Sequence, residues 1–182
     1  MRIRIDHIAK IEGHASFVAD IVKGDVESAR IKVDEGARLI EGIMRGRDFE
    51  EVPEIGSRIC GVCPVVHNLT AWKSIEASQK IKPSNQTIQL RKLMMLGQQI
   101  NSHALHIFFF SLADFFNFEN DLELISKYPK KTHDALGLRD AANKIIEVIG
   151  GRSIHPVSAC LGGFRCLPKK ENLNNLIKIG ED

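Results

Sequence analysis

The most informative stretch of this sequence is Arg58-Ile59-Cys60-Gly61-Val62-Cys63-Pro64-Val65-Val66-His67, which contains two cysteines at a metal-binding spacing. A C-x-x-C spacing brings two sulfurs to one side of a tight turn, and Gly61 lets the backbone curl there without a Cβ penalty. Because proline is favoured at the first helical position, Pro64 predicts a helix that runs to about Lys80. Cys63 then lies at the positive end of this helix, which favours the metal-binding thiolate.

Two polar side chains flank the cysteine pair. His67 lies one turn into the predicted helix, where it can hydrogen-bond a ligated sulfur or relay protons, and Arg58 adds positive charge that we expect to help bind a cofactor. The spacing alone is typical of half a structural zinc site or of a thiol-redox pair. However, a zinc site needs four ligands and the sequence has no second C-x-x-C, while a thioredoxin-like pair needs a βαβ context that the surrounding pattern lacks.

Four ordered motifs resemble the large subunit of nickel-iron hydrogenases. The run Arg-Ile-Cys-Gly-Val-Cys-x-x-x-His is similar to the amino-terminal metal-binding motif of that family. Ile11-Glu12-Gly13-His14 resembles the family's Arg-Ile-Glu-Gly-His box, with Lys10 where arginine is commoner. Arg45-Gly46-Arg47-Asp48 precedes the cysteines at the family's spacing, and Gly151-Arg152-Ser153-Ile154-His155-Pro156 resembles a box of the cytosolic branch, which includes methyl-viologen-reducing and sulfhydrogenase-like enzymes.

The resemblance implies heterolytic H2 oxidation or production at a nickel-iron centre. It makes Cys60 a terminal nickel ligand and Cys63 a bridge between nickel and iron, with His67 tuning the bridging sulfur; soft thiolates suit both metals. It makes Glu12 the carboxylate that accepts the proton. Glu41 stands where the family has a ligand to a magnesium or iron ion, a hard cation that carboxylates suit. From the residues alone, both glutamates read as solvated surface carboxylates.

The family's second cysteine pair, in a carboxy-terminal Asp-Pro-Cys-x-x-Cys motif, does not occur in this sequence. Cys160 and Cys166 match no ligand position of the family, and we expect ordinary thiols there. We therefore expect the amino-terminal portion of a large subunit, which supplies half of the cysteine ligands. Its expected partners are the missing carboxy-terminal half and a small subunit carrying iron-sulfur clusters, with H2 and protons as substrates. Two alternatives stay open: a non-catalytic scaffold of the hydrogenase and quinone-reductase superfamily, or a small zinc or thiol-redox module completed by Cys160 or Cys166.

Length and charge narrow the class of protein. The sequence has 182 residues, a formal net charge of +2 and four cysteines. The length fits one domain, and the balanced charge calls for no polyanionic partner, so we expect no nucleic acid. No apolar run is long enough to span a bilayer, and the start Met-Arg-Ile-Arg-Ile-Asp is no signal peptide. Four cysteines without a secretory signal indicate a reducing compartment, and we expect the cytoplasm.

Hydrophobic periodicity predicts an α+β fold, with a small amino-terminal antiparallel sheet followed by a long-helix bundle, as in a truncated hydrogenase large subunit. We expect one domain, 1–182, with a β region at 1–35 and a mainly helical region at 36–182. Apolar residues alternate with polar ones on both sides of Lys23-Gly24-Asp25. This period of two predicts a hairpin that turns there.

The helical region contains three further predicted helices. A short helix is expected at 37–44. Ser84 and Asn85 are plausible caps for a long helix at 84–117, whose apolar stripe faces a core and whose phenylalanine-rich end needs covering by a neighbour. Another helix, 132–149, should end at Gly150-Gly151 and be followed by a glycine-rich loop. In that loop His155, held extended by the following proline, either lines the site or is a buried structural histidine.

Overall fold

The structure is a computed structural model that describes residues 1–9, 11, 13–33 and 37–181. The chain divides into two compact units, Met1–Arg45 and Gly46–Asp182. Within the described part of the chain, no helix is both long enough and apolar enough to cross a membrane.

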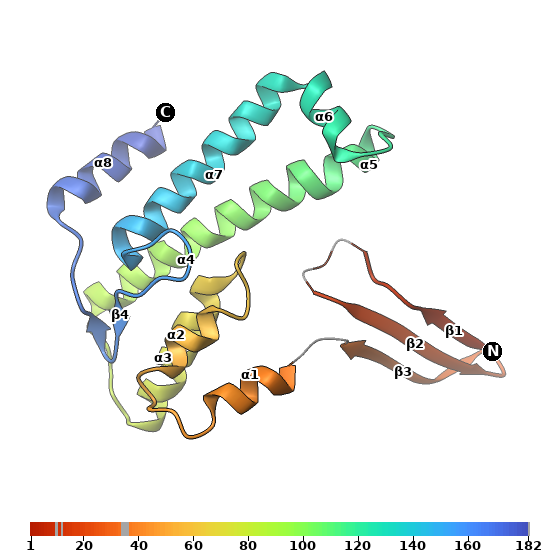
Figure 1. Cartoon of the computed structure of the whole chain (residues 1–182), viewed down its shortest axis with the longest axis horizontal. Helices are drawn as coiled ribbons and strands as arrows, with labels where there is room; N and C mark the ends of the chain where they lie inside the picture. The colour runs from red at the N-terminus through yellow and green to blue at the C-terminus, as the bar shows by residue number, and fades with distance from the viewer. Residues whose placement is uncertain (10, 12, 34–36, 182) are drawn as a thin grey trace. The chain divides into compact units, whose positions relative to one another are not determined.

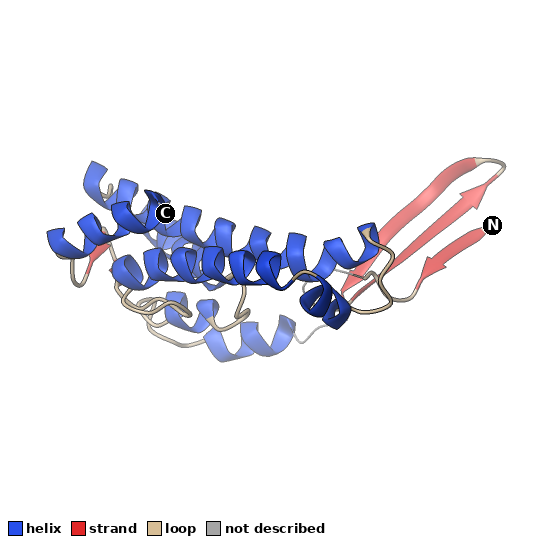
Figure 2. Ribbon diagram, turned by 90° about the horizontal axis from the view of Figure 1, so that it is seen from above, coloured by secondary structure: helices blue, strands red, loops and turns tan. Residues whose placement is uncertain are grey.

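The first unit is a three-stranded antiparallel sheet followed by a short helix (Figure 2). Its elements are β1 (Arg2–Ile5), β2 (Ala15–Val22), β3 (Asp25–Val33) and α1 (Ala37–Met44). The strand order is β1-β2-β3, and the β2–β3 connection turns at Lys23 and Gly24, whose φ angles are +55° and +96°. Two consecutive positive φ values suit the right-handed twist of a two-residue hairpin. The predicted hairpin and the predicted helix at 37–44 are both confirmed.

The second unit is helical. Its elements are α2 (Val52–Ser57), α3 (Pro64–Ser78), α4 (Asn85–Leu105), the π-helical turn η1 (His106–Ser111), α5 (Leu112–Phe115), α6 (Asp121–Lys127), α7 (Pro129–Gly150), β4 (Ala159–Cys160), β5 (Gly163–Phe164) and α8 (Lys170–Glu181). The long helices α4 and α7 lie side by side and run in opposite directions, and α2 packs on α3 (Figure 1). A sheet followed by a helical bundle confirms the predicted fold class.

The core of the second unit lies where α3, α4 and α7 meet. Its central side chains are Val65 and Trp72 from α3, Met94 from α4, and Ile146 from α7. The absence of a side chain at Gly97 lets α4 approach α7 closely, because a Cβ there would lie 3.0 Å from the carbonyl oxygen of Ala142 on α7. Through these core contacts, α3, which begins directly after Cys63 and is called the cysteine helix below, packs on the two longest helices of the unit.

The long helix predicted at 84–117 is confirmed as one unbroken helical run from Asn85 to Phe115, but it is not a regular α-helix throughout. Ser84 caps α4 as expected, since its Oγ accepts a hydrogen bond from the Thr87 amide at 3.2 Å. The α-helix ends at Leu105 and passes into the π-helical turn η1 before α5. The wider turn changes the helical phase, so that Phe108 and Ala113 are both buried.

The helix predicted at 132–149 is α7, which begins earlier, at Pro129. Its predicted end is confirmed, because Gly151 follows with the left-handed φ of +81° that favours glycine after a helix. The expected glycine-rich loop follows and contains the small β4–β5 hairpin.

Candidate functional site

The cysteine pair lies in the connection between α2 and α3. Cys63 is the N-cap residue of α3, which begins at Pro64 as predicted. Cys60 is buried, and its Sγ accepts hydrogen bonds from the amides of Val62 at 3.3 Å and Cys63 at 3.2 Å. Two amides directed at one sulfur define the shape of the turn. None of the four cysteines, all of which the structure describes, forms a disulfide.

The other two predicted residues of this stretch lie on either side of the turn. Arg58 is the C-cap residue of α2, and its half-exposed guanidinium lies 3.9 Å from the Glu54 carboxylate. His67 is half-buried on the first turn of α3, and its backbone amide lies 3.5 Å from the Cys63 carbonyl oxygen that accepts its hydrogen bond. Arg58, both cysteines and His67 thus lie along one local segment that runs from the end of α2 to the first turn of α3.

Gln98 of α4 touches this segment, and the sequence reasoning did not single it out. Its side chain is buried, and its Oε1 accepts hydrogen bonds from the amides of Val65 at 2.7 Å and Val66 at 3.2 Å. These amides belong to the first turn of α3, where helical amides have no partner within their own helix. Gln98 thus caps the cysteine helix from a different helix.

A second set of contacts reaches the turn from the loop after α7. His155 Nδ1 lies 2.8 Å from the carbonyl oxygen of Ser57, the last residue of α2. Asn68 of α3 donates hydrogen bonds from its buried amide group to the carbonyls of Pro53 at 3.1 Å and Pro156 at 3.4 Å. The predicted extended backbone at His155 is wrong, because its φ is +53°. The imidazole of His155 therefore contacts the last residue of α2.

A small cavity of about 60 Å³, lined by both polar and apolar residues, lies beside the turn. Gly61 and Gln98 line it together with Asn101 and Arg139, and Arg139 Nε donates to Asn101 Oδ1 at 2.8 Å. A cavity of this size holds a few water molecules. It therefore gives water a place next to the cysteine turn.

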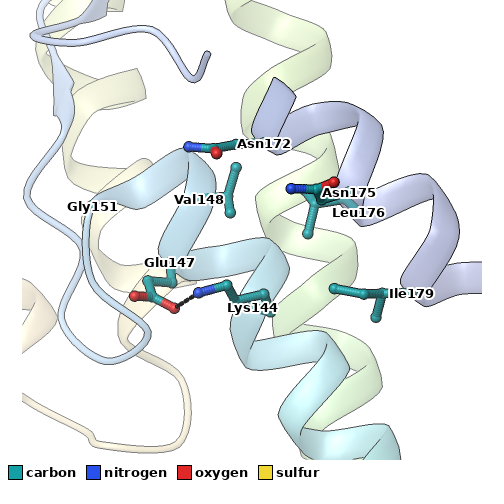
Figure 3. Close-up of a pocket in the computed structure, with 8 residues that line it drawn as sticks. All are labelled: Lys144, Glu147, Val148, Gly151, Asn172, Asn175, Leu176 and Ile179. Carbon is teal, nitrogen blue, oxygen red and sulfur yellow. Dashed lines mark hydrogen bonds and ion pairs between the residues drawn. The ribbon is translucent and has the colours of Figure 1, made fainter. Parts of the chain in front are cut away.

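A second cavity, between α7 and α8, is lined by residues other than the cysteines and histidines that bind thiophilic metals (Figure 3). It has a volume of about 250 Å³, and its charged groups are the ion pair of Lys144 and Glu147, with an N–O distance of 2.8 Å. The asparagines Asn172 and Asn175 line its α8 side. Since no cysteine or histidine lines it, this cavity is not a candidate site for a thiophilic metal.

Both predicted carboxylates belong to the first unit, Met1–Arg45, whereas the cysteine pair belongs to the second. Glu12 lies outside the described residues, so its predicted approach to a cysteine sulfur stays a prediction. Glu41 is exposed on α1, in the first unit. Among the residues that the structure describes, no three or more histidine, cysteine, aspartate or glutamate side chains gather to hold a metal. In the described part of the chain, neither Cys160 nor Cys166 therefore completes a ligand set with the cysteine pair.

Comparisons with known proteins agree with this arrangement. The family model described as nickel-dependent hydrogenase matches residues 38–137. The alpha subunit of sulfhydrogenase 2 from Pyrococcus furiosus is 33% identical over 176 residues, which cover 97% of this chain and 43% of the relative. The vhu F420-non-reducing hydrogenase of Methanocaldococcus jannaschii has a subunit that is 32% identical over 185 residues, covering 97% of this chain and 44% of the relative.

Solved structures show the same similarity. An NAD+-reducing NiFe hydrogenase in the H2-reduced state matches with a TM-score of 0.80 and 27% identity, over 98% of this chain and 41% of the other. The Ni-Fe-Se hydrogenase from D. vulgaris Hildenborough matches with a TM-score of 0.76 and 26% identity, over 100% and 40%. The chain thus spans less than half the length of these relatives. Because the family model covers more than half of the chain and includes the C-x-x-C turn, this chain belongs to the nickel-dependent hydrogenase family.

Proposed function

We propose that this chain supplies the first cysteine pair of a nickel-iron centre in a hydrogenase large subunit, and that the assembled enzyme interconverts H2 with two protons and two electrons. The observation that carries the proposal is the turn in which Cys60 and Cys63 are held at the start of α3. Membership of the nickel-dependent hydrogenase family and the hydrogenase names of the relatives support it.

The residues of the turn fit a nickel-iron group. Nickel and iron accept thiolate ligands readily, and a C-x-x-C turn presents two of them together. The positive end of α3, where Cys63 lies, suits a negatively charged sulfur. When bound, the metals supply redox chemistry that amino-acid side chains lack. The pair fills part of a ligand set, so the remaining ligands must come from the rest of the subunit.

Each residue of the segment has a proposed role. Cys60 would hold the nickel through its thiolate, and Cys63 would be a thiolate ligand to the nickel-iron group. His67 would act on the Cys63 sulfur from the first turn of α3, where it is half-buried. Arg58 contributes positive charge at the edge of the cofactor site, on the exposed end of α2.

Two carboxylates have proposed roles that rest on the family resemblance. Glu12 accepts the proton released when H2 is split, because a carboxylate can take up a proton and pass it to water. Glu41 binds a magnesium or iron ion through its oxygens.

The proposed partners follow from the same proposal. A small subunit with iron-sulfur clusters carries the electrons, and the other half of the large subunit brings the second cysteine pair. The relatives named as F420-non-reducing hydrogenases and sulfhydrogenases support a place in the cytosolic branch, and we propose a cytoplasmic location on this basis.

Metal analysis of the assembled hydrogenase tests the proposal. We expect nickel and iron in the purified complex, and H2-dependent reduction of a viologen dye. Cys63→Ser should lose both metals, whereas Cys166→Ser should keep them because Cys166 is exposed and lies in a different segment. Stoichiometric zinc in place of nickel, or a Cys63→Ser complex with full nickel content, would overturn the proposal.

A further inference from the structure

We propose that Gln98 and His155 are positioning residues that hold the Cys60–Cys63 turn ready for metal from its two sides, an inference that rests on the proposed metal-binding function of the turn. His155 contacts the residue that ends α2, just before the turn, and Gln98 contacts the residues that begin α3, just after it. The contacts join positions that are 98 and 33 residues apart in the sequence.

The contact on the α3 side replaces a local helix cap. Helices favour Ser, Thr, Asp or Asn at the N-cap, where a side-chain oxygen accepts hydrogen bonds from the first turn. Here Cys63 occupies that position, and its sulfur is a weak acceptor. Buried amides need partners, and Gln98 supplies an oxygen to Val65 and Val66 from α4. Gln98 thus lets the helix start at a cysteine.

The contact on the α2 side comes with backbone strain. His155 has a φ of +53°, which lies in the left-handed region that is unfavourable for a residue other than glycine. This conformation accompanies the placement of Nδ1 at 2.8 Å from the Ser57 carbonyl oxygen, to which a protonated Nδ1 donates. The last carbonyls of a helix have no partner within it, so the ring satisfies an acceptor that α2 leaves open. Fixing this carbonyl fixes where the cysteine turn begins.

Together the two contacts anchor both ends of a short segment to rigid neighbours. A metal that binds a preset pair of sulfurs does not have to order the turn, and this raises its affinity. Loss of either contact frees one end of the turn while leaving both thiols in the chain. Mutation of groups that orient metal ligands typically weakens metal binding by about 10–100-fold. We expect the lower part of that range for each contact, because the other contact remains.

Cadmium titration of the full 182-residue chain tests the proposal, with thiolate-to-metal absorption as the readout. Gln98→Leu removes the acceptor and should weaken Cd2+ binding about tenfold, whereas Gln98→Glu keeps a carboxyl oxygen at the same reach and should stay within about threefold of the unchanged chain. Gln99→Leu is the matched control, since Gln99 is the exposed neighbour on the same helix. Hydrogen exchange should also accelerate at the amides of Val65 and Val66 in Gln98→Leu and stay slow in Gln98→Glu.

A parallel pair of variants tests the other side of the turn. His155→Ala should weaken Cd2+ binding about tenfold. His155→Asn should restore most of the affinity, because asparagine tolerates a positive φ and its amide can donate to the Ser57 carbonyl. Leu124→Ala serves as a control for general destabilisation, since Leu124 is buried on α6 and makes no part of the turn. It should lower the melting temperature and leave Cd2+ affinity unchanged.

The outcomes separate positioning from the proposed function. Unchanged Cd2+ affinity in folded Gln98→Leu and His155→Ala, or an equal loss in Leu124→Ala, would overturn the positioning role. If Gln98→Leu does not fold, Gln98→Asn takes its place, because its shortened side chain draws the acceptor away from the α3 amides. An assembled complex that lacks nickel and H2 activity, while these variants still weaken Cd2+ binding, would refute the hydrogenase proposal and leave the positioning role standing.

Discussion

A buried ion pair between Glu76 of α3 and Arg91 of α4 offers a strong test of what holds the second unit together. The guanidinium meets the carboxylate through two hydrogen bonds, at 2.8 and 2.7 Å, and both side chains are largely buried, with 5% and 8% of their surface exposed. Glu76 also accepts a hydrogen bond from the Gly162 amide at 2.8 Å, and Arg91 donates to the Cys160 carbonyl at 2.9 Å. The pair therefore ties two helices to the β4–β5 hairpin.

Replacing one partner should leave the other charge buried without compensation. Glu76→Met removes the carboxylate, and breaking a buried pair in this way typically costs about 3–5 kcal/mol. The total stability of a domain is about 5–15 kcal/mol, so this loss is a large fraction of it. For a unit of this size, 1 kcal/mol corresponds to about 3 °C, so the melting temperature should fall by about 10–15 °C.

The double variant makes the test specific. Glu76→Met combined with Arg91→Met removes both charges and fills the space with apolar groups, which is often nearly neutral. Here the Gly162 amide and the Cys160 carbonyl lose partners, so we expect a total cost of about 1–3 kcal/mol, less than for Glu76→Met alone.

Urea denaturation followed by circular dichroism measures the four free energies of unfolding in this cycle. The exposed ion pair of Lys144 and Glu147 provides the comparison, and its removal should cost less than about 1 kcal/mol. Additive effects of the two single changes would refute the reasoning, because they would show that the two buried charges do not depend on each other.

Helix packing, proton transfer and sheet electrostatics can be tested in the same way. Gly97→Ala should destabilise the second unit by about 1–3 kcal/mol, because the new Cβ would lie 3.0 Å from the Ala142 carbonyl oxygen on α7. Gly137→Ala, which has open space around its Cβ, should instead stabilise the unit by about 0.5–1 kcal/mol. Similar melting temperatures for the two variants would contradict this prediction. In the assembled enzyme, Glu12→Gln should keep nickel and iron but lower H2 oxidation and H2/D+ exchange by about 100-fold or more, and unchanged rates would remove Glu12 from the mechanism. The hydrogen bond from Arg2 lowers the pKa of Asp20 below its usual value. This pair therefore stabilises the sheet at pH values above the unfolded-state pKa of Asp20, and the stability is lost as pH falls through the folded-state pKa. Arg2→Ala should raise the pKa of Asp20 in an NMR titration, and an unchanged pKa would contradict this assignment.

The elements that the sequence predicted well are those with local signals. The hairpin turn at Lys23 and Gly24 follows from a short turn sequence between alternating strands, and the start of α3 follows from a proline after Cys63. Ser84 likewise marks the start of α4, because its hydroxyl accepts a hydrogen bond from the Thr87 amide in the first turn of the helix. In each case the stabilising contact lies within a few residues of the signal.

The contacts that the sequence reasoning missed join distant positions. Gln98 caps α3 across 33 residues, and His155 reaches Ser57 across 98. No window of sequence contains both partners, so periodicity and turn chemistry cannot reveal them. One signal was present: a helix that starts at Cys63 lacks a good local cap, which predicts that an acceptor from another element supplies one.

The strain at His155 is tolerated because its loop is fixed by contacts that do not involve its side chain. On one side, the Ser158 amide donates to the Gly150 carbonyl at 3.0 Å, at the end of α7. Further along, Arg91 holds the Cys160 carbonyl. A backbone fixed at both places can keep an unfavourable φ, since relaxing it would break these contacts as well. The imidazole is therefore carried to the end of α2 by a loop whose position is set elsewhere, and truncating it should release the cysteine turn while the loop stays in place.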